Sequence, residues 1–158
     1  MMVYKEIMDT KNEAATACQA AADIFKNGFN CAQAVFASLS SELGLDPVIA
    51  KKIAGAFGGG MAHNGEVCGA VTGALMLIGL KYGKYKEDDV DSKANTNRIA
   101  NDFINKFKKE HGSIKCKELL KYDLSIEEEA AKARESGVFK TFCPLLVKRS
   151  VELVLEVL

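Results

Sequence analysis

The fourteen residues from Val67 to Leu80 carry no charged side chain, and this run constrains the fold more than any other part of the chain. A helix that crosses a bilayer needs about 20 apolar residues, and the glycines and the threonine inside this run weaken it further. A shorter uncharged segment of this kind is typical of a helix inside a protein. The run therefore predicts a buried core helix and not a membrane span.

The rest of the composition fits a globular protein that can cover such a helix. Hydrophobic residues make up 48% and charged residues 27% of the 158 residues, which are values typical of globular domains. We expect a single helical domain over residues 1–158, because a chain of this length supports one core.

The formal net charge is zero, so no positive field favours nucleic acid or a membrane surface. The segment MMVYKEIMDTKNEAA lacks the pattern of a signal peptide, which predicts a cytoplasmic protein.

Apolar residues recur at helical spacing through most of the chain, and the alternating pattern of strands is nearly absent. The predicted fold is all-α, a single-domain bundle of about six to eight helices. The segment GGGMAHNGE predicts a flexible, turn-rich loop. Besides the helix built on the uncharged run and closed by Gly83, the expected helical segments are residues 3–27, 31–43, 45–57, about 88–111, 114–122, 126–136 and 144–158.

Capping residues set several of these helix starts. Asn30 is expected to cap the second helix, and Asp46 followed by Pro47 is expected to begin the third. Ser125 and Glu128 have the spacing of a capping box. In the last helix, which Pro144 begins, four residues are expected on one apolar side: Leu145, Val151, Leu155 and Leu158.

Five cysteines, at positions 18, 31, 68, 116 and 143, form no C-x-x-C pair. The sequence therefore has no motif for c-type haem attachment. An odd number of cysteines in a chain expected in the cytoplasm argues against a disulfide scaffold, because the cytosol keeps structural thiols reduced. The thiols are then expected to pack, to react or to bind a metal.

Four of the five cysteines, Cys31, Cys68, Cys116 and Cys143, fall within a turn of an expected helix start. Unpaired amide groups and the positive end of the helix dipole stabilise a thiolate or an anionic cluster there. We expect these four sulfur atoms to lie together and Cys18 to lie apart, packed in the first helix. Cys68 is further expected to have a lowered pKa, although Glu66 opposes this. Simple burial of all four thiols is the alternative.

Glycines near these cysteines are candidates for the wall of a binding site. Gly69 and Gly73 share one face of the expected helix, where they would allow a backbone to approach Cys68. Gly58, Gly59 and Gly60 could turn amide groups toward an anion or a sulfur ligand. The alternatives are ordinary tight packing for the first pair and a plain connection for the triple glycine.

The two histidines, His63 and His111, are secondary candidates for a ligand or an acid near the thiols. His111 lies at the end of a helix, where a protonated imidazole interacts favourably with the helix dipole. The acidic residues of positions 127–129 and 88–91 are expected at helix starts, so they require no catalytic role.

Taken together, four segments resemble the C_GCAxxG_C_C family of redox-active proteins. The segments are GFNCAQAVFASL, GAFGGGMAHNGEVCGAVTGALMLIGLKYG, GSIKCKELL, and Cys143 ahead of an amphipathic helix. The similarity covers roughly residues 20–158 and places the family's cysteines at Cys31, Cys68, Cys116 and Cys143. The box reads C-G-A-x-x-G here, which we interpret as a difference of notation or of subfamily. The resemblance implies a helical protein, mostly found in anaerobic microbes, whose cysteines serve redox or metal chemistry.

Three functions remain open at this point. In the first, the four cysteines hold an iron–sulfur cluster or another thiolate-bound metal for electron transfer. In the second, pairs of them exchange between dithiol and disulfide. In the third, the chain is a structural or interaction module. No nucleotide motif is present, because GAFGGGMAHNG lacks the P-loop lysine. The expected partners are an unidentified redox partner and, as an open alternative, a second copy of the chain.

Overall fold

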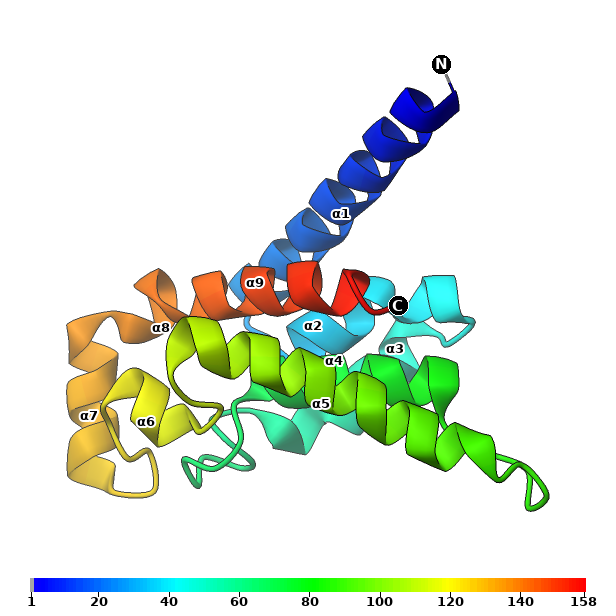
Figure 1. The fold of residues 1–158 in the computed structure, drawn as a ribbon. Helices are drawn as coiled ribbons and strands as arrows, with labels where there is room; N and C mark the ends of the chain where they lie inside the picture. The colour runs from blue at the N-terminus through cyan, green and yellow to red at the C-terminus, as the bar shows by residue number, and fades with distance from the viewer. Residues whose placement is uncertain (1) are drawn as a thin grey trace.

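The computed structural model describes the backbone of residues 2–158 and the side chains of residues 11–158. The all-α prediction is confirmed, and Figure 1 shows the helices in order. An isolated antiparallel bridge between Val67 and Lys115 is the nearest approach to a strand in this part of the chain. The α-helices are α1 (Met2–Lys26), α2 (Cys31–Ser40), α3 (Pro47–Ile53), α4 (Gly69–Tyr82), α5 (Asp91–His111), α6 (Cys116–Leu120), α7 (Glu127–Ser136), α8 (Val138–Thr141) and α9 (Cys143–Leu155), with 3-10 turns η1 (Ser41–Leu43) and η2 (Ala54–Phe57).

Local sequence signals set the starts of α2 and α3. The Asn30 side chain accepts from the backbone N–H of Gln33, and the Gln33 side chain accepts from the N–H of Asn30, so α2 begins with a capping box. The Asp46 carboxylate accepts from the amides at the start of α3, where Pro47 occupies the first turn. Both caps predicted from the sequence are confirmed.

Two details of the predicted helices are wrong. Ser125 does not cap α7, because its backbone N–H and its hydroxyl both donate to the Asp123 carboxylate, and α7 begins after Ile126 without a side-chain cap. In α9 the predicted apolar side is shifted, because Leu145 is 60% exposed while Leu146 and Val147 are buried.

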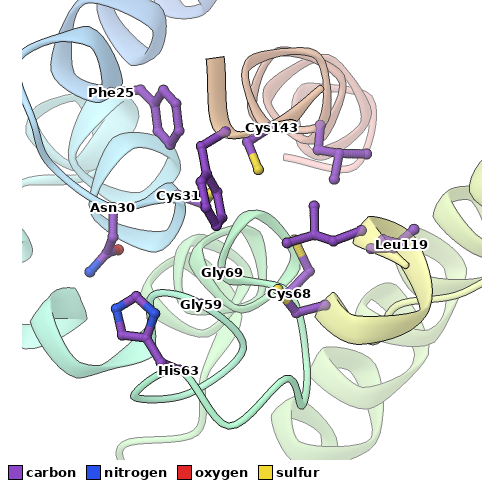
Figure 2. A pocket seen from close by; sticks show the side chains of 13 residues that line it. Phe25, Asn30, Cys31, Gly59, His63, Cys68, Gly69, Leu119 and Cys143 are labelled. Carbon is purple, nitrogen blue, oxygen red and sulfur yellow. The ribbon is translucent and has the colours of Figure 1, made fainter. Parts of the chain in front are cut away.

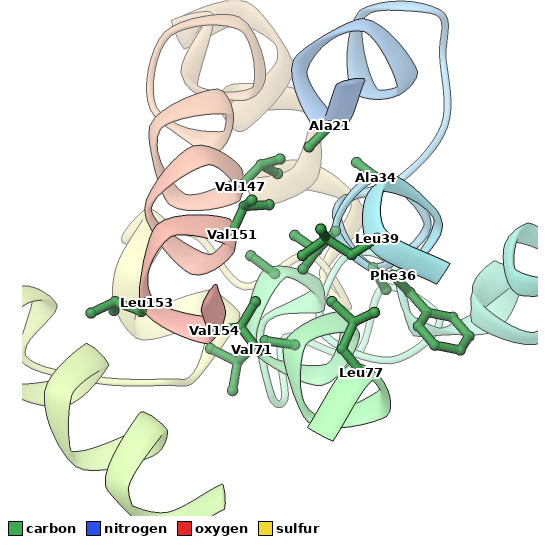
Figure 3. Packing of buried hydrophobic residues seen from close by; sticks show 14 of the residues in the cluster. Ala21, Ala34, Phe36, Leu39, Val71, Leu77, Val147, Val151, Leu153 and Val154 are labelled. Atoms are coloured by element: carbon green, nitrogen blue, oxygen red, sulfur yellow. The ribbon is translucent and has the colours of Figure 1, made fainter. Parts of the chain in front are cut away.

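The core lies where α2, α4 and α9 meet, and Figure 3 shows their aliphatic side chains packed together. The uncharged run forms α4, and eight of its helix residues are buried, as predicted for a core helix. No helix in the described residues is long and apolar enough to span a bilayer. Val71 and Leu77 of α4 and Val151 and Val154 of α9 belong to this core. Burial of apolar side chains of this size stabilises the fold by roughly 1.5–3 kcal/mol each.

Two glycines bring α4 against α2. A Cβ atom at Gly73 would lie 2.7 Å from the carbonyl oxygen of Ala32 and 3.0 Å from the Cβ of Val35. A Cβ atom at Gly69 would lie 2.9 Å from the backbone nitrogen of Ala32. Only glycine fits these two positions at this helix separation, so the interpretation of Gly69 and Gly73 as tight packing residues is supported.

We predict that Gly73→Ala destabilises the protein, because the added methyl group meets the backbone of α2. The expected loss is about 1–3 kcal/mol in the free energy of unfolding, measured by urea denaturation. Gly55→Ala is the matched control, since a Cβ atom there meets only the Gln33 side chain at 3.8 Å. The control should be neutral or slightly stabilising. Equal effects of the two substitutions would mean that the α2–α4 contact tolerates a methyl group.

Candidate functional site

Four cysteines from four separate helix starts line one cavity, which Figure 2 shows from close by. Cys31 is the first residue of α2, Cys68 precedes the first residue of α4, and Cys116 and Cys143 begin α6 and α9. The cavity has a volume of about 120 Å³. The rest of its wall consists of Asn30, Gly59, His63, Gly69 and the apolar side chains Phe25, Leu119, Leu120, Phe139 and Leu146.

Cys18 lies apart from this cavity. Its side chain is buried between α1 and α9, and its thiol donates to the carbonyl oxygen of Lys148 at 3.8 Å. This placement matches the packing role that its position in the first helix suggests.

Backbone hydrogen bonds hold Cys68 and Cys116 side by side. The N–H of Cys68 donates to the carbonyl oxygen of Ile114 at 2.8 Å, and the N–H of Cys116 donates to that of Glu66 at 2.6 Å. The bridge between Val67 and Lys115 lies between these two bonds. The two cysteines are thus positioned by main-chain pairing. No side-chain motif in the sequence predicts this pairing.

Glycines bring backbone close to the thiols. A Cβ atom at Gly69 would lie 3.1 Å from the Cβ of Cys31, and one at Gly60 would lie 2.6 Å from the Cβ of Cys116. A Cβ atom at Gly58 would meet the side chain of Asn30 at 2.5 Å. Of the five glycines predicted to surround a cofactor, Gly59 and Gly69 line the cavity, whereas Gly58, Gly60 and Gly73 permit close packing around it.

The loop that follows η2 is a left-handed turn. Five consecutive residues, Gly59 to His63, have φ values between 51° and 69°, and three of them are not glycine. Left-handed backbone costs roughly 1–2 kcal/mol for each residue that has a side chain. The loop expected to be flexible is instead tied by main-chain bonds, among them Ala62 N–H to Ala56 O at 2.8 Å and Glu66 N–H to Gly60 O at 3.0 Å. This turn carries His63 to the mouth of the cavity.

Two of the thiols form a hydrogen-bonded pair. This bond between Cys31 and Cys143 raises the pKa of Cys31 well above its ordinary value, and burial of Cys31 adds to the rise. The same bond lowers the pKa of Cys143, against the effect of burial. Cys143 is therefore the better acid of the pair, and Cys31 is the donor that stabilises its thiolate.

The expectation of a lowered pKa at Cys68 is wrong. Burial raises the pKa of Cys68 to about 11, although the amides of Ala70 and Val71 oppose this effect. Burial and the neighbouring thiols likewise raise the pKa of Cys116 to about 12. The amides at the start of α4 are present, as the sequence suggested. Burial of the thiol raises the pKa of Cys68 by more than these amides lower it. Cys68 is also only 4% exposed, so solvent has little access to its thiol.

The two histidines have different positions. His63 is exposed on one side and lines the cavity on the other. His111 lies outside the cavity wall, with its ring 4.5 Å from that of Phe107, and burial lowers its pKa. The protonated His111 expected at the end of α5 is thus disfavoured by its surroundings.

Sequence reasoning missed the apolar part of the cavity wall. Phe25 and Phe139 lie in α1 and α8, and their helical spacing is that of ordinary core residues. The sequence identifies Asn30 as a helix cap. Nothing in the sequence indicates that Asn30 also lines the cavity. The triple glycine and the following Asn64–Gly65 pair do indicate a loop, but not its left-handed path.

In the described residues no three side chains of His, Cys, Asp or Glu are grouped closely enough to hold a single metal ion. The four thiols share a cavity wall and are spread around it. The donor set is nevertheless the one that iron–sulfur clusters use, namely four cysteine sulfurs. The described side chains therefore do not present the close grouping that one tetrahedral ion requires.

A comparison with protein-family models finds one match, over residues 29–157, to C_GCAxxG_C_C, described as "Putative redox-active protein (C_GCAxxG_C_C)". The comparisons with curated proteins and with solved structures find no match. All four cavity cysteines lie inside the matched range, and Cys18 lies outside it.

We predict that Ala62→Gly stabilises the protein by about 1 kcal/mol, because glycine removes the left-handed strain at this exposed position. Urea denaturation measures the change. Ala15→Gly is the matched control, since Ala15 is exposed in α1, where the same substitution costs about 1 kcal/mol. Loss of stability in both variants would contradict the left-handed turn.

We also predict that the reduced, metal-free protein loses stability as the pH rises from 9 towards 11. A thiol with a raised pKa in the folded chain stays protonated while the unfolded chain ionises, so the stabilisation present below pH 9 disappears above it. The loss is up to about 1.4 kcal/mol per pH unit for each such thiol. Urea denaturation across this range should give a smaller slope for Cys68→Ser, because Cys68 no longer contributes. If the free energy of unfolding fell equally with pH in Cys68→Ser and in the unaltered protein, the raised pKa of Cys68 would be contradicted.

Proposed function

This chain belongs to the C_GCAxxG_C_C family, and from that premise we propose that it transfers electrons at an iron–sulfur cluster held by Cys31, Cys68, Cys116 and Cys143. Redox activity is the family's described property, whereas the cluster and its four ligands are our proposal. When bound, such a cluster supplies a one-electron carrier whose potential depends on burial and on hydrogen bonds to its sulfurs. The partner would be another electron carrier.

The observation that carries this proposal is the convergence of four thiols from four helix starts on one cavity. The cavity measures about 120 Å³, whereas a single water needs roughly 10–15 Å³. A group that fills this volume gains packing free energy on the order of 24 cal/mol per Å³, or about 3 kcal/mol. A bound cofactor would therefore stabilise the fold as well as act in it.

The electrostatics of the thiols support a cationic occupant. The hydrogen bond to Cys143 and burial raise the pKa of Cys31, and burial, with a smaller effect of neighbouring thiols, raises the pKa values of Cys68 and Cys116, so these thiols are protonated near neutral pH. A metal centre replaces the thiol protons, because its positive charge favours thiolate ligands. The same charge offsets the repulsion between neighbouring thiolates. The helix-start amides then stabilise the negative charge on the sulfurs.

The spread of the thiols favours a cluster over a single zinc ion. Four cysteines around one zinc must place all four sulfurs about 2.3 Å from the ion, and the described residues contain no such grouping. A cluster distributes its cysteine ligands over more than one iron atom.

We also expect a cytoplasmic location, because all five cysteines are free thiols in the structure.

Thiol–disulfide exchange is a second candidate, and the Cys31–Cys143 hydrogen bond favours it. In this reaction the Cys143 thiolate attacks a small disulfide and releases one thiolate. The Cys31 thiolate then attacks the mixed disulfide and releases the second thiolate. Two electrons pass from the pair to the substrate, and the two protons of the cysteines pass to the released thiolates. Cys143 is buried and Cys31 is half-buried, which makes this reaction slow with a protein disulfide.

We predict that protein prepared without air binds iron and sulfide, and that Cys68→Ser loses most of both while Cys18→Ser retains them. Serine is nearly isosteric with cysteine, but its hydroxyl is a poor ligand at neutral pH. Iron, acid-labile sulfide and the visible spectrum of each variant measure the bound cluster. The same substitution at Cys31, Cys116 and Cys143 should also reduce it.

Melting temperatures of the metal-free forms serve as the control for folding. Cys18→Ser should lower the melting temperature, because a hydroxyl buried without a new partner costs about 1–3 kcal/mol. Absence of iron and sulfide, with a Cys31–Cys143 disulfide formed on mild oxidation, would replace the cluster proposal by thiol exchange. If neither is observed, the chain is a structural helical module.

A further inference from the structure

Helix α4 has no polar face, yet the side chains of residues 11–158 do not cover all of it. Leu75 and Met76 are half-buried and Leu80 is 38% exposed, whereas their neighbours Leu77 and Ile78 are fully buried. The incompletely covered positions 75, 76 and 80 lie on one side of the helix, which also carries the buried Thr72. A helix that is apolar all round is ordinarily buried on every side. The outer side of α4 is therefore incompletely covered by the described residues.

The uncovered side is continuous with an apolar groove. Thr72, Leu75 and Met76 of α4 and Phe57 of η2 line a shallow groove of about 320 Å³. Ile53, four residues before Phe57, is 51% exposed. We call Phe57, Thr72, Leu75, Met76 and Leu80 the α4 face. Leu80 is the exposed member of this face and Phe57, Leu75 and Met76 are half-buried, so the face leaves apolar surface without a partner in the described residues.

We infer that the α4 face binds the same face of a second copy of this chain, with the two α4 helices antiparallel. Charges at the two ends of α4 select this arrangement: Glu66 precedes the helix and Lys84 follows it. Neither makes an ion pair within the described part of the chain. In an antiparallel pair each Glu66 approaches the Lys84 of the other copy, whereas a parallel pair would bring like charges together.

A second copy also matches the α4 face in composition. The run from Val67 to Leu80 has no charge, so its partner must present an apolar surface without buried charges. The α4 face supplies such a surface in a two-fold, self-complementary contact. The net charge of the chain is zero, so no long-range repulsion opposes the association. The antiparallel helix dipoles add to the attraction.

Sedimentation velocity over a range of protein concentrations tests the inference on the reduced, metal-free chain. We expect a dimer for the unaltered protein, and we expect Met76→Glu or Leu80→Glu to raise the dissociation constant at least about tenfold. Leu145→Glu is the matched control, because Leu145 is 60% exposed on α9 and lies outside the α4 face. The control should leave the dissociation constant unchanged. Urea denaturation of each variant shows whether its monomer remains folded.

Charge exchange tests the antiparallel arrangement. Glu66→Lys and Lys84→Glu should each weaken the dimer about threefold or more, and the two together should restore it. A protein that is monomeric at about 100 μM overturns the inference, and so does a dimer that Met76→Glu, Leu80→Glu and Leu145→Glu affect equally. A dimer that the single charge reversals leave unchanged overturns the antiparallel arrangement. None of these outcomes depends on whether the cysteines bind a cluster.

Discussion

The contact between α2 and α4 determines where the cavity forms. At Gly69 and Gly73 the backbone of α4 lies so close to α2 that a methyl group at either position would overlap its atoms. The same approach brings the start of α4 beside the start of α2, so Cys31 and Cys68 enter the cavity from neighbouring helix ends. Larger residues at these two positions would separate the helices and the thiols together.

The other half of the cavity depends on backbone pairing. The segment before α4 pairs with the segment before α6, which places Cys116 next to Cys68. The left-handed turn that starts at Gly59 closes on this pairing through the bond from Glu66 to Gly60. Strain in the turn is thus balanced by hydrogen bonds that also fix the cysteines. Local strain of this kind often accompanies functional sites, because surrounding structure holds it in place.

Much of the fold could be predicted from residue spacing, because helical periodicity and caps such as Asn30 act locally. The helix-start positions of Cys31 and Cys143 were also accessible, from the cap Asn30 and from Pro144, whereas α4 and α6 begin without a side-chain cap. The raised pKa of Cys68 could not be predicted from the sequence, because desolvation depends on which segments cover the thiol. The Cys31–Cys143 bond was equally hidden, since it joins residues that only tertiary packing brings together. Ser125 shows the limit of a motif, because its hydroxyl bonds Asp123 and leaves α7 uncapped.

The order of the cysteines along the chain has a consequence for biogenesis. Cys31 and Cys143 are 112 positions apart (143 − 31), yet their thiols share a hydrogen bond. A ribosome adding roughly 5–20 residues per second makes Cys31 several seconds before Cys143. During synthesis the early thiols therefore exist without their later neighbours, and the cavity can close only after α9 has emerged. Machinery that delivers the proposed metal centre would therefore complete it only after Cys143 has been translated.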